Sequence, residues 1–149
     1  MIALAAEAID PAALLADFSR EMAGAGAVVS FSGIGRPDDG IGELWLDHHD
    51  RLTLSAIEEV AVVARERFAI ADVAIVHRVG AVGLGQPIVF VAAASSHRRA
   101  AFDAVDFVMD RLKTAVPLWK CEARGGDRKW VQARPQDHAD AARWECSYE

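Results

Sequence analysis

The alternation of hydrophobic and polar residues divides the chain into three helices and several short strands. Apolar residues recur at helical spacing in residues 10–22, 53–68 and 95–116, which gives each helix one face that can pack on a sheet. Between the helices, alternating or continuous apolar runs indicate strands, because a strand points successive side chains to opposite faces. The predicted strands cover residues 2–9, 27–32, 43–49, 73–79, 87–94, 118–124 and 130–134.

The third helix is the element around which the chain is organised. Ser95 or Ser96 can cap its N-terminus, and Pro117 ends it because proline cannot continue a helix. Its predicted buried stripe consists of Phe102, Val105, Met109, Leu112 and Val116.

These elements predict a single α+β domain over residues 1–149. Their order, β-α-β-β-α-β-β-α-β-β, favours a mixed, mostly antiparallel sheet with three main helices, and we find no internal repeat or linker. A chain of 149 residues that is 52% hydrophobic is long enough for one core. Residues 135–149 are mainly polar, and we expect them to form a C-terminal tail.

Charge and composition exclude several classes of function. The net charge of -6 is a poor match for a nucleic-acid backbone, although basic residues gather between Arg98 and Arg134, which favours a small anionic ligand. The N-terminus lacks the basic segment of a signal peptide, and no apolar run is long enough to span a membrane, so we expect a cytoplasmic protein. Cys121 and Cys146 lack metal-ligand spacing and are expected to be reduced thiols.

Basic residues lie at both ends of the third helix. His97, Arg98 and Arg99 occupy its first turn, where backbone N–H groups favour an anion, and Lys113 lies in its last turn. Arg98 and Lys113 are fifteen residues apart, which corresponds to roughly 22 Å along a helix. One small ligand cannot contact both ends of one copy. Either the two ends serve different purposes, or two copies pack around a two-fold axis so that opposite ends meet.

Three further residues are candidates for chemistry. Lys120 follows the helix end, so its ammonium group can face the same space as that of Lys113. A lysine with a like charge nearby and partial desolvation can become a base or nucleophile, but spacing alone also allows two solvated surface lysines. Glu122 shares a strand face with Lys120 and can either orient it or form a plain surface ion pair. Arg36, in the glycine-rich loop 33–40, can clamp a phosphate or simply remain solvated.

Four segments together resemble the large, catalytic subunit of molybdopterin synthase. They are residues 27–36, 74–102, 107–122 and 126–134, which span most of the chain from Ala27 onward. The resemblance depends on the combination of three motifs, S-x-H-R, L-K-T-x-x-P-x-W-K and a following W-V.

The resemblance implies an α/β-hammerhead fold and a sulfurtransferase. Such an enzyme inserts two sulfurs into cyclic pyranopterin monophosphate to form the dithiolene of molybdopterin. The sulfur would arrive as a thiocarboxylate on the Gly-Gly C-terminus of a small ubiquitin-like subunit. Two large subunits would form a homodimer, and two small subunits would complete a heterotetramer. No cofactor or metal is implied.

The resemblance also implies roles for individual residues. Lys113 and Lys120 would be catalytic, and the active site would combine residues of both protomers. Cys121 is not expected to carry sulfur, because the partner supplies it. The alternative is a non-catalytic anion-binding or regulatory dimer of the same fold, which the presence of all these basic residues disfavours. The implied substrate-binding residues are Arg36, Lys113, Lys120 and Glu122 from one protomer with His97 and Arg98 from the other.

Overall fold

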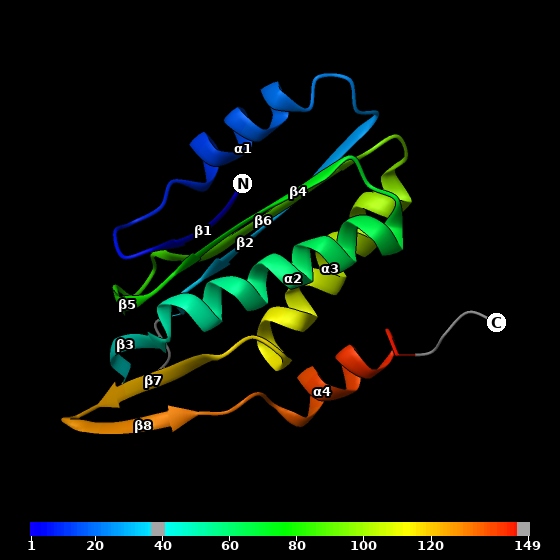
Figure 1. Cartoon of the computed structure of the whole chain (residues 1–149). Coiled ribbons are helices and arrows are strands. Elements are labelled where there is room, and N and C mark those ends of the chain that lie inside the picture. The colour runs from blue at the N-terminus through cyan, green and yellow to red at the C-terminus, as the bar shows by residue number, and fades with distance from the viewer. Residues whose placement is uncertain (37–40, 146–149) are drawn as a thin grey trace.

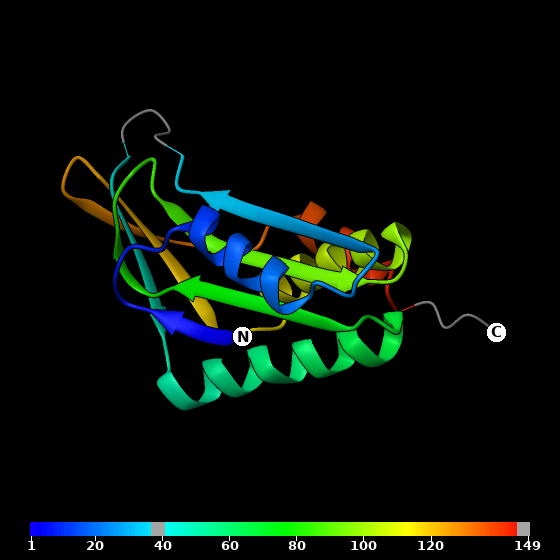
Figure 2. The ribbon, with the colours of Figure 1, turned by 90° about the horizontal axis from the view of Figure 1, so that it is seen from above.

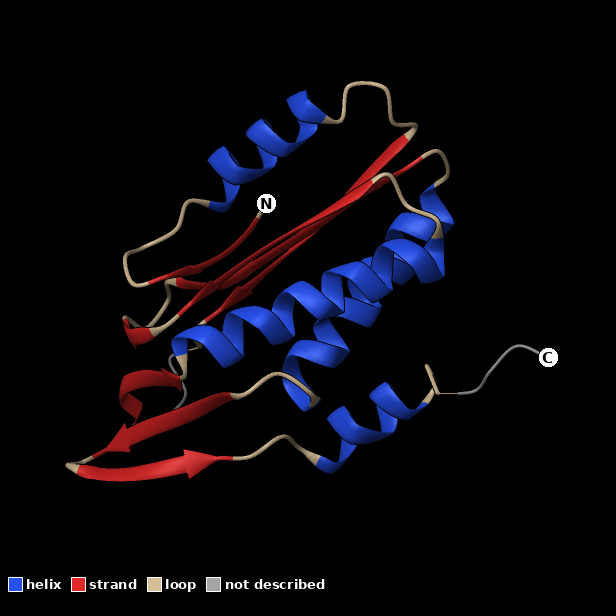
Figure 3. Cartoon of the chain, viewed as in Figure 1, coloured by secondary structure: helices blue, strands red, loops and turns tan. Residues whose placement is uncertain are grey.

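The computed structural model describes residues 1–36 and 41–145 and confirms the predicted α+β class. Figure 3 shows helices and strands segregated into layers. The described residues form four helices, where three main helices were predicted. The elements are β1 (Ile2–Ala5), α1 (Pro11–Glu21), β2 (Ala27–Ile34), β3 (Ile41–His48), α2 (Asp50–Phe68), β4 (Asp72–Arg78), β5 (Gly80–Val82), β6 (Pro87–Ser95), α3 (Arg98–Thr114), β7 (Leu118–Arg124), β8 (Asp127–Val131) and α4 (Pro135–Ala142).

The strands form two four-stranded sheets. The first has the order β1-β4-β6-β2, in which β1 is parallel to β4 and the other pairs are antiparallel. Its edge strands β1 and β2 lie on opposite sides in the view from above (Figure 2). The second sheet has the order β5-β3-β7-β8 and is antiparallel throughout. The predicted mixed, mostly antiparallel arrangement is therefore confirmed, although it is divided between two sheets.

The first sheet is buried on both faces. Helix α1 covers one face, and α2 and α3 lie side by side on the other (Figure 1). Along β4 the side chains alternate, so that Val73 and Ile75 pack toward α2 and α3 while Ala74 and Val76 pack toward α1. Burial on both faces explains why β4 and β6 have continuous apolar sequences.

The predicted cap and buried stripe of α3 need correction. His97 is the N-cap, whereas Ser95 still belongs to β6 and its hydroxyl accepts a hydrogen bond from the His97 N–H at 3.4 Å. Phe102 is 52% exposed, because α3 turns small side chains such as Ala101 and Ala104 toward the sheet and leaves the bulky ring outside. Val105, Leu112 and Val116 are buried as predicted.

The expected polar tail is wrong for residues 135–142, which form α4. Pro135 occupies the first turn, and the Asp137 carboxylate accepts a 2.8 Å hydrogen bond from the Arg134 backbone N–H. Beyond the helix, Trp144 makes edge-on contacts with Phe68 and Phe107 at 5.6 Å between ring centroids. Aromatic packing therefore ties the C-terminal segment to α2 and α3.

Two predictions concern residues outside the described ranges, and one strand of the structure was not predicted. Cys146 and residues 37–40 of the predicted glycine-rich loop lie outside the described residues, whereas Cys121 is a free, buried thiol. Strand β5 was not predicted, because it has only three residues and begins with Gly80 at a φ of 75°.

Candidate functional site

The predicted site residues lie at the two ends of α3. His97 and Arg98 begin the helix, and Lys113 lies in its last turn, beside the second sheet that carries Lys120 (Figure 1). The seventeen residues of α3 extend over roughly 25 Å, so the two ends of one copy cannot meet. The structure thus confirms the separation that the sequence predicted.

Lys120 and Glu122 form a close ion pair on β7. The Lys120 Nζ lies 2.7 Å from Glu122 Oε1, and Arg124 approaches the other carboxylate oxygen at 3.4 Å. Glu122 is 9% exposed, and the hydrogen bond from Lys120 lowers the pKa of its carboxyl group, against the opposing effect of burial. Glu122 is therefore anionic and holds Lys120 in place, as their shared strand face predicted.

Lys113 has a looser partner that the sequence interpretation missed. Its Nζ lies 3.9 Å from Oδ1 of Asp137 on α4, and its side chain is half exposed. Asp137 is buried and bonded to the Arg134 guanidinium at 3.0 Å, and chiefly this bond lowers the pKa of Asp137 to about 2. Proline at 135 followed by an acid at 137 is a helix-start signal that reveals α4, but no local signal reveals the contact with Lys113.

The N-terminal end of α3 has a different character. His97, Arg98 and Arg99 are exposed, and none of the ion pairs within the described part of the chain involves them. Arg98 and Arg99 line a concavity of about 630 Å³ between β2 and α3, together with Phe31 and Phe102. Asp103 and Asp106 line it as well, so this surface combines charges of both signs with exposed aromatic rings.

Arg36 lies at the other end of the molecule from His97. It follows Gly35, whose N–H donates to the Gln86 carbonyl at 2.9 Å, and its side chain is exposed. Gly26, ten residues earlier, is packed so closely on the Ser96 backbone that a Cβ atom would collide with it. Ten residues of extended chain span roughly 30 Å, so Arg36 and His97 of one copy do not meet.

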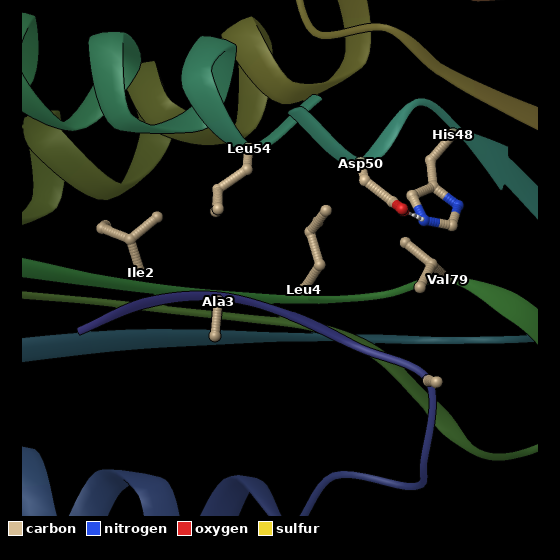
Figure 4. A pocket seen from close by; sticks show the side chains of 8 residues that line it. Ile2, Ala3, Leu4, His48, Asp50, Leu54 and Val79 are labelled. Carbon is tan, nitrogen blue, oxygen red and sulfur yellow. Dashed lines mark ion pairs between the residues drawn. The ribbon is translucent and has the colours of Figure 1, made fainter. Parts of the chain in front are cut away.

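A second concavity, of about 650 Å³, lies between β1 and the start of α2 and contains none of the predicted site residues. Figure 4 shows its apolar lining, including Leu4 and Leu54, and the His48–Asp50 ion pair at 2.7 Å. Among the described residues, no helix is long and apolar enough to cross a lipid bilayer.

Comparisons with known proteins identify relatives along nearly the whole chain. Residues 4–115 match the family model of the MoaE protein. A molybdopterin synthase catalytic subunit from Pseudomonas aeruginosa is 43% identical over 141 residues, which cover 93% of this chain and 94% of the relative.

Solved structures share the fold. A molybdopterin biosynthesis MoaE protein from Burkholderia ambifaria has a TM-score of 0.84 and 38% identity, with 99% of each chain covered. A Helicobacter pylori structure, described as the complex of subunits 1 and 2 of molybdopterin-converting factor, has a TM-score of 0.78 and 23% identity, with 89% of this chain and 91% of that chain covered. Its curated relatives are molybdopterin synthase catalytic subunits, and the chain belongs to the MoaE family.

Proposed function

We propose that this protein is the catalytic subunit of a molybdopterin synthase. It transfers two sulfur atoms to cyclic pyranopterin monophosphate and so forms the molybdopterin dithiolene. The observation that carries this proposal is the family membership, combined with two lysines that lie beside nearly buried carboxylates at one end of α3. The reaction takes place in the cytoplasm.

The sulfur donor is a small ubiquitin-like subunit whose Gly-Gly C-terminus carries a thiocarboxylate. Its two copies join a homodimer of this chain to form a heterotetramer. The Helicobacter pylori structure of the same fold, described as a complex of two subunits, is consistent with such a partner. The gathering of basic residues between Arg98 and Arg134, in a chain of net charge -6, suits an anionic peptide end and a phosphate-bearing pterin.

The homodimer forms through the edge strand β2. This strand leaves one row of backbone groups unpaired and exposes Phe31 at 42% and Ile34 at 48%. When two β2 edges pair in antiparallel fashion around Phe31, residue 36 of one copy lies opposite residue 26 of the other. Since Gly26 adjoins Ser96, this pairing brings Arg36 next to the partner's N-terminal end of α3.

The residues then divide the chemistry between them. Arg36 of one protomer, with His97 and Arg98 of the other, binds the phosphate and ring oxygens of the pterin through charge-assisted hydrogen bonds. Lys113 faces the incoming thiocarboxylate, first as its ion-pair partner and then as a base or transient nucleophile. Lys120, oriented by Glu122, polarises the pterin or moves protons.

The direct test mixes the protein with a thiocarboxylated small subunit and cyclic pyranopterin monophosphate and measures the dithiolene. The proposal predicts two sulfurs incorporated per pterin. Tight pterin binding without dithiolene, despite an active small subunit from a known synthase, would instead indicate a non-catalytic anion-binding dimer.

A further inference from the structure

We propose that Asp137, on the C-terminal helix α4, is a positioning residue that directs the Lys113 ammonium group toward the sulfur donor. This inference rests on the function proposed above. It gives α4, a segment outside the matched family residues 4–115, a role in the active site.

In the Lys113–Asp137 pair, the carboxylate is fixed and the ammonium group can move. The Asp137 side chain is 8% exposed, whereas that of Lys113 is 52% exposed. Their 3.9 Å separation is longer than a hydrogen bond, so the attraction is electrostatic and leaves the three N–H donors of the ammonium group available. Lys113 is thus directed by a carboxylate without being saturated by it, and an incoming thiocarboxylate can accept its hydrogen bonds.

Asp137 is held by its own helix start. Its carboxylate accepts hydrogen bonds from the Arg134 backbone N–H at 2.8 Å and from the Arg134 guanidinium at 3.0 and 3.3 Å. Because these bonds come from the first turn of α4, the position of the carboxylate follows the position of that helix.

Docking of α4 does not depend on the contact with Lys113. On α3, Asp110 accepts hydrogen bonds from Arg143 at 2.9 Å and from the Trp144 indole at 2.6 Å, and the Trp144 ring packs on Phe107. A half-exposed ion pair at 3.9 Å adds little stability to these contacts. The effect of Asp137 on Lys113 is therefore to position it, and Asp110 offers a matched control on the same pair of helices.

The test compares Asp137→Asn with Asp110→Asn in the complete complex with thiocarboxylated small subunit. We expect Asp137→Asn to lower kcat for dithiolene formation about tenfold, since a misplaced reacting group costs rate, with the KM for the pterin within about twofold of wild type. Asp110→Asn should keep kcat within about twofold, because its amide oxygen can still accept both hydrogen bonds and the packing of Trp144 on Phe107 keeps α4 docked. If Asp137→Asn does not fold, Asp137→Glu, which keeps the charge and moves it by one methylene, should show an intermediate loss of kcat.

A second readout works without turnover. The rate at which N-hydroxysuccinimidyl acetate acetylates Lys113, followed by peptide mass spectrometry, should rise in Asp137→Asn and not in Asp110→Asn, because loss of the carboxylate releases the Lys113 side chain from its position beside α4. If the wild-type protein formed no dithiolene, the proposed function would be refuted. The acetylation rates of Lys113 would still test its contact with Asp137. Unchanged kcat and labelling in Asp137→Asn, or equal losses in both variants, would overturn the positioning role.

Discussion

The two ends of helix α3 show how one protomer can build half of a site and leave the other half to its partner. At the C-terminal end, Lys113 and Lys120 each lie beside a nearly buried carboxylate, so their positions are set inside the chain. At the N-terminal end, His97 and Arg98 are exposed and pair with no carboxylate among the described residues. The lysines therefore have their carboxylate partners before any assembly, whereas under the proposed function His97 and Arg98 reach a site only in the dimer.

The largest effect on turnover is expected when the two lysines are replaced by residues that keep their charge. We expect Lys113→Arg and Lys120→Arg to bind the partner and the pterin but to turn over at least about a hundredfold more slowly, because arginine does not lose its proton at working pH. Single-turnover dithiolene formation measures this. Near-normal turnover in Lys113→Arg would show that only its charge matters.

The dimer edge can be tested with Phe31→Asp. Two unpaired carboxylates would face each other across the proposed two-fold axis, and we expect the dissociation constant of the homodimer to rise about a hundredfold. Sedimentation equilibrium provides the measurement, and Leu52→Asp, at an exposed position on α2, provides the control. A stable Phe31→Asp dimer would place the interface elsewhere.

The cations at the shared site should contribute binding energy instead of rate. Neutralising Arg36 or Arg98 to alanine removes a charge-assisted contact, which should weaken pterin binding by about 1.5 to 3 kcal/mol, or roughly 10- to 150-fold. Calorimetric titration of the pterin into each variant dimer gives the dissociation constant. Wild-type affinity in both variants would remove these residues from the pocket.

The smallest expected effect is on stability and comes from the buried carboxylate of Asp137. Its pKa is about 2 in the folded protein against an ordinary value of 3.8, so the unfolded chain binds the proton more tightly. The stabilisation is therefore complete above about pH 4, is lost as the pH falls toward 2, and amounts to at most about 2 kcal/mol. In urea unfolding, the free energy of unfolding of wild type should exceed that of Asp137→Asn by this amount at pH 7. The difference should shrink below pH 4. If this difference in unfolding free energy did not vary with pH, it would be due to packing and not to the charge of Asp137.

Local patterns predicted most of the elements and the contact between Lys120 and Glu122 correctly. Helical spacing placed α2 and α3, and alternation along β7 put Lys120 and Glu122 on one face, because both signals depend on neighbours only a few residues apart. The predicted helix over residues 10–22 likewise has a local cause, because the Asp10 carboxylate accepts hydrogen bonds from the Ala12 and Ala13 N–H groups and so caps α1.

Contacts between distant residues could not be predicted in this way. Phe102 fits a helical stripe, but its exposure depends on how α3 rotates against the sheet. The polar composition after residue 134 suggested a tail, although Pro135 and Asp137 carry a helix-start signal, and the packing of Trp144 on residues of α2 and α3 then holds this segment in place. The Lys113–Asp137 contact depends on that packing, so it was missed as well.

The shared site is tested most directly by mixed dimers of an Arg98→Ala chain with a Lys113→Ala chain. In such a heterodimer, one site collects both substitutions and the other keeps both wild-type residues. At a pterin concentration near the wild-type dissociation constant, where the weakened sites of Arg98→Ala stay mostly empty, the account predicts that each parent homodimer is nearly inactive and that the heterodimer regains about half of the wild-type dithiolene formation. A correctly folded heterodimer that binds the small subunit yet is as inactive as either parent would contradict it.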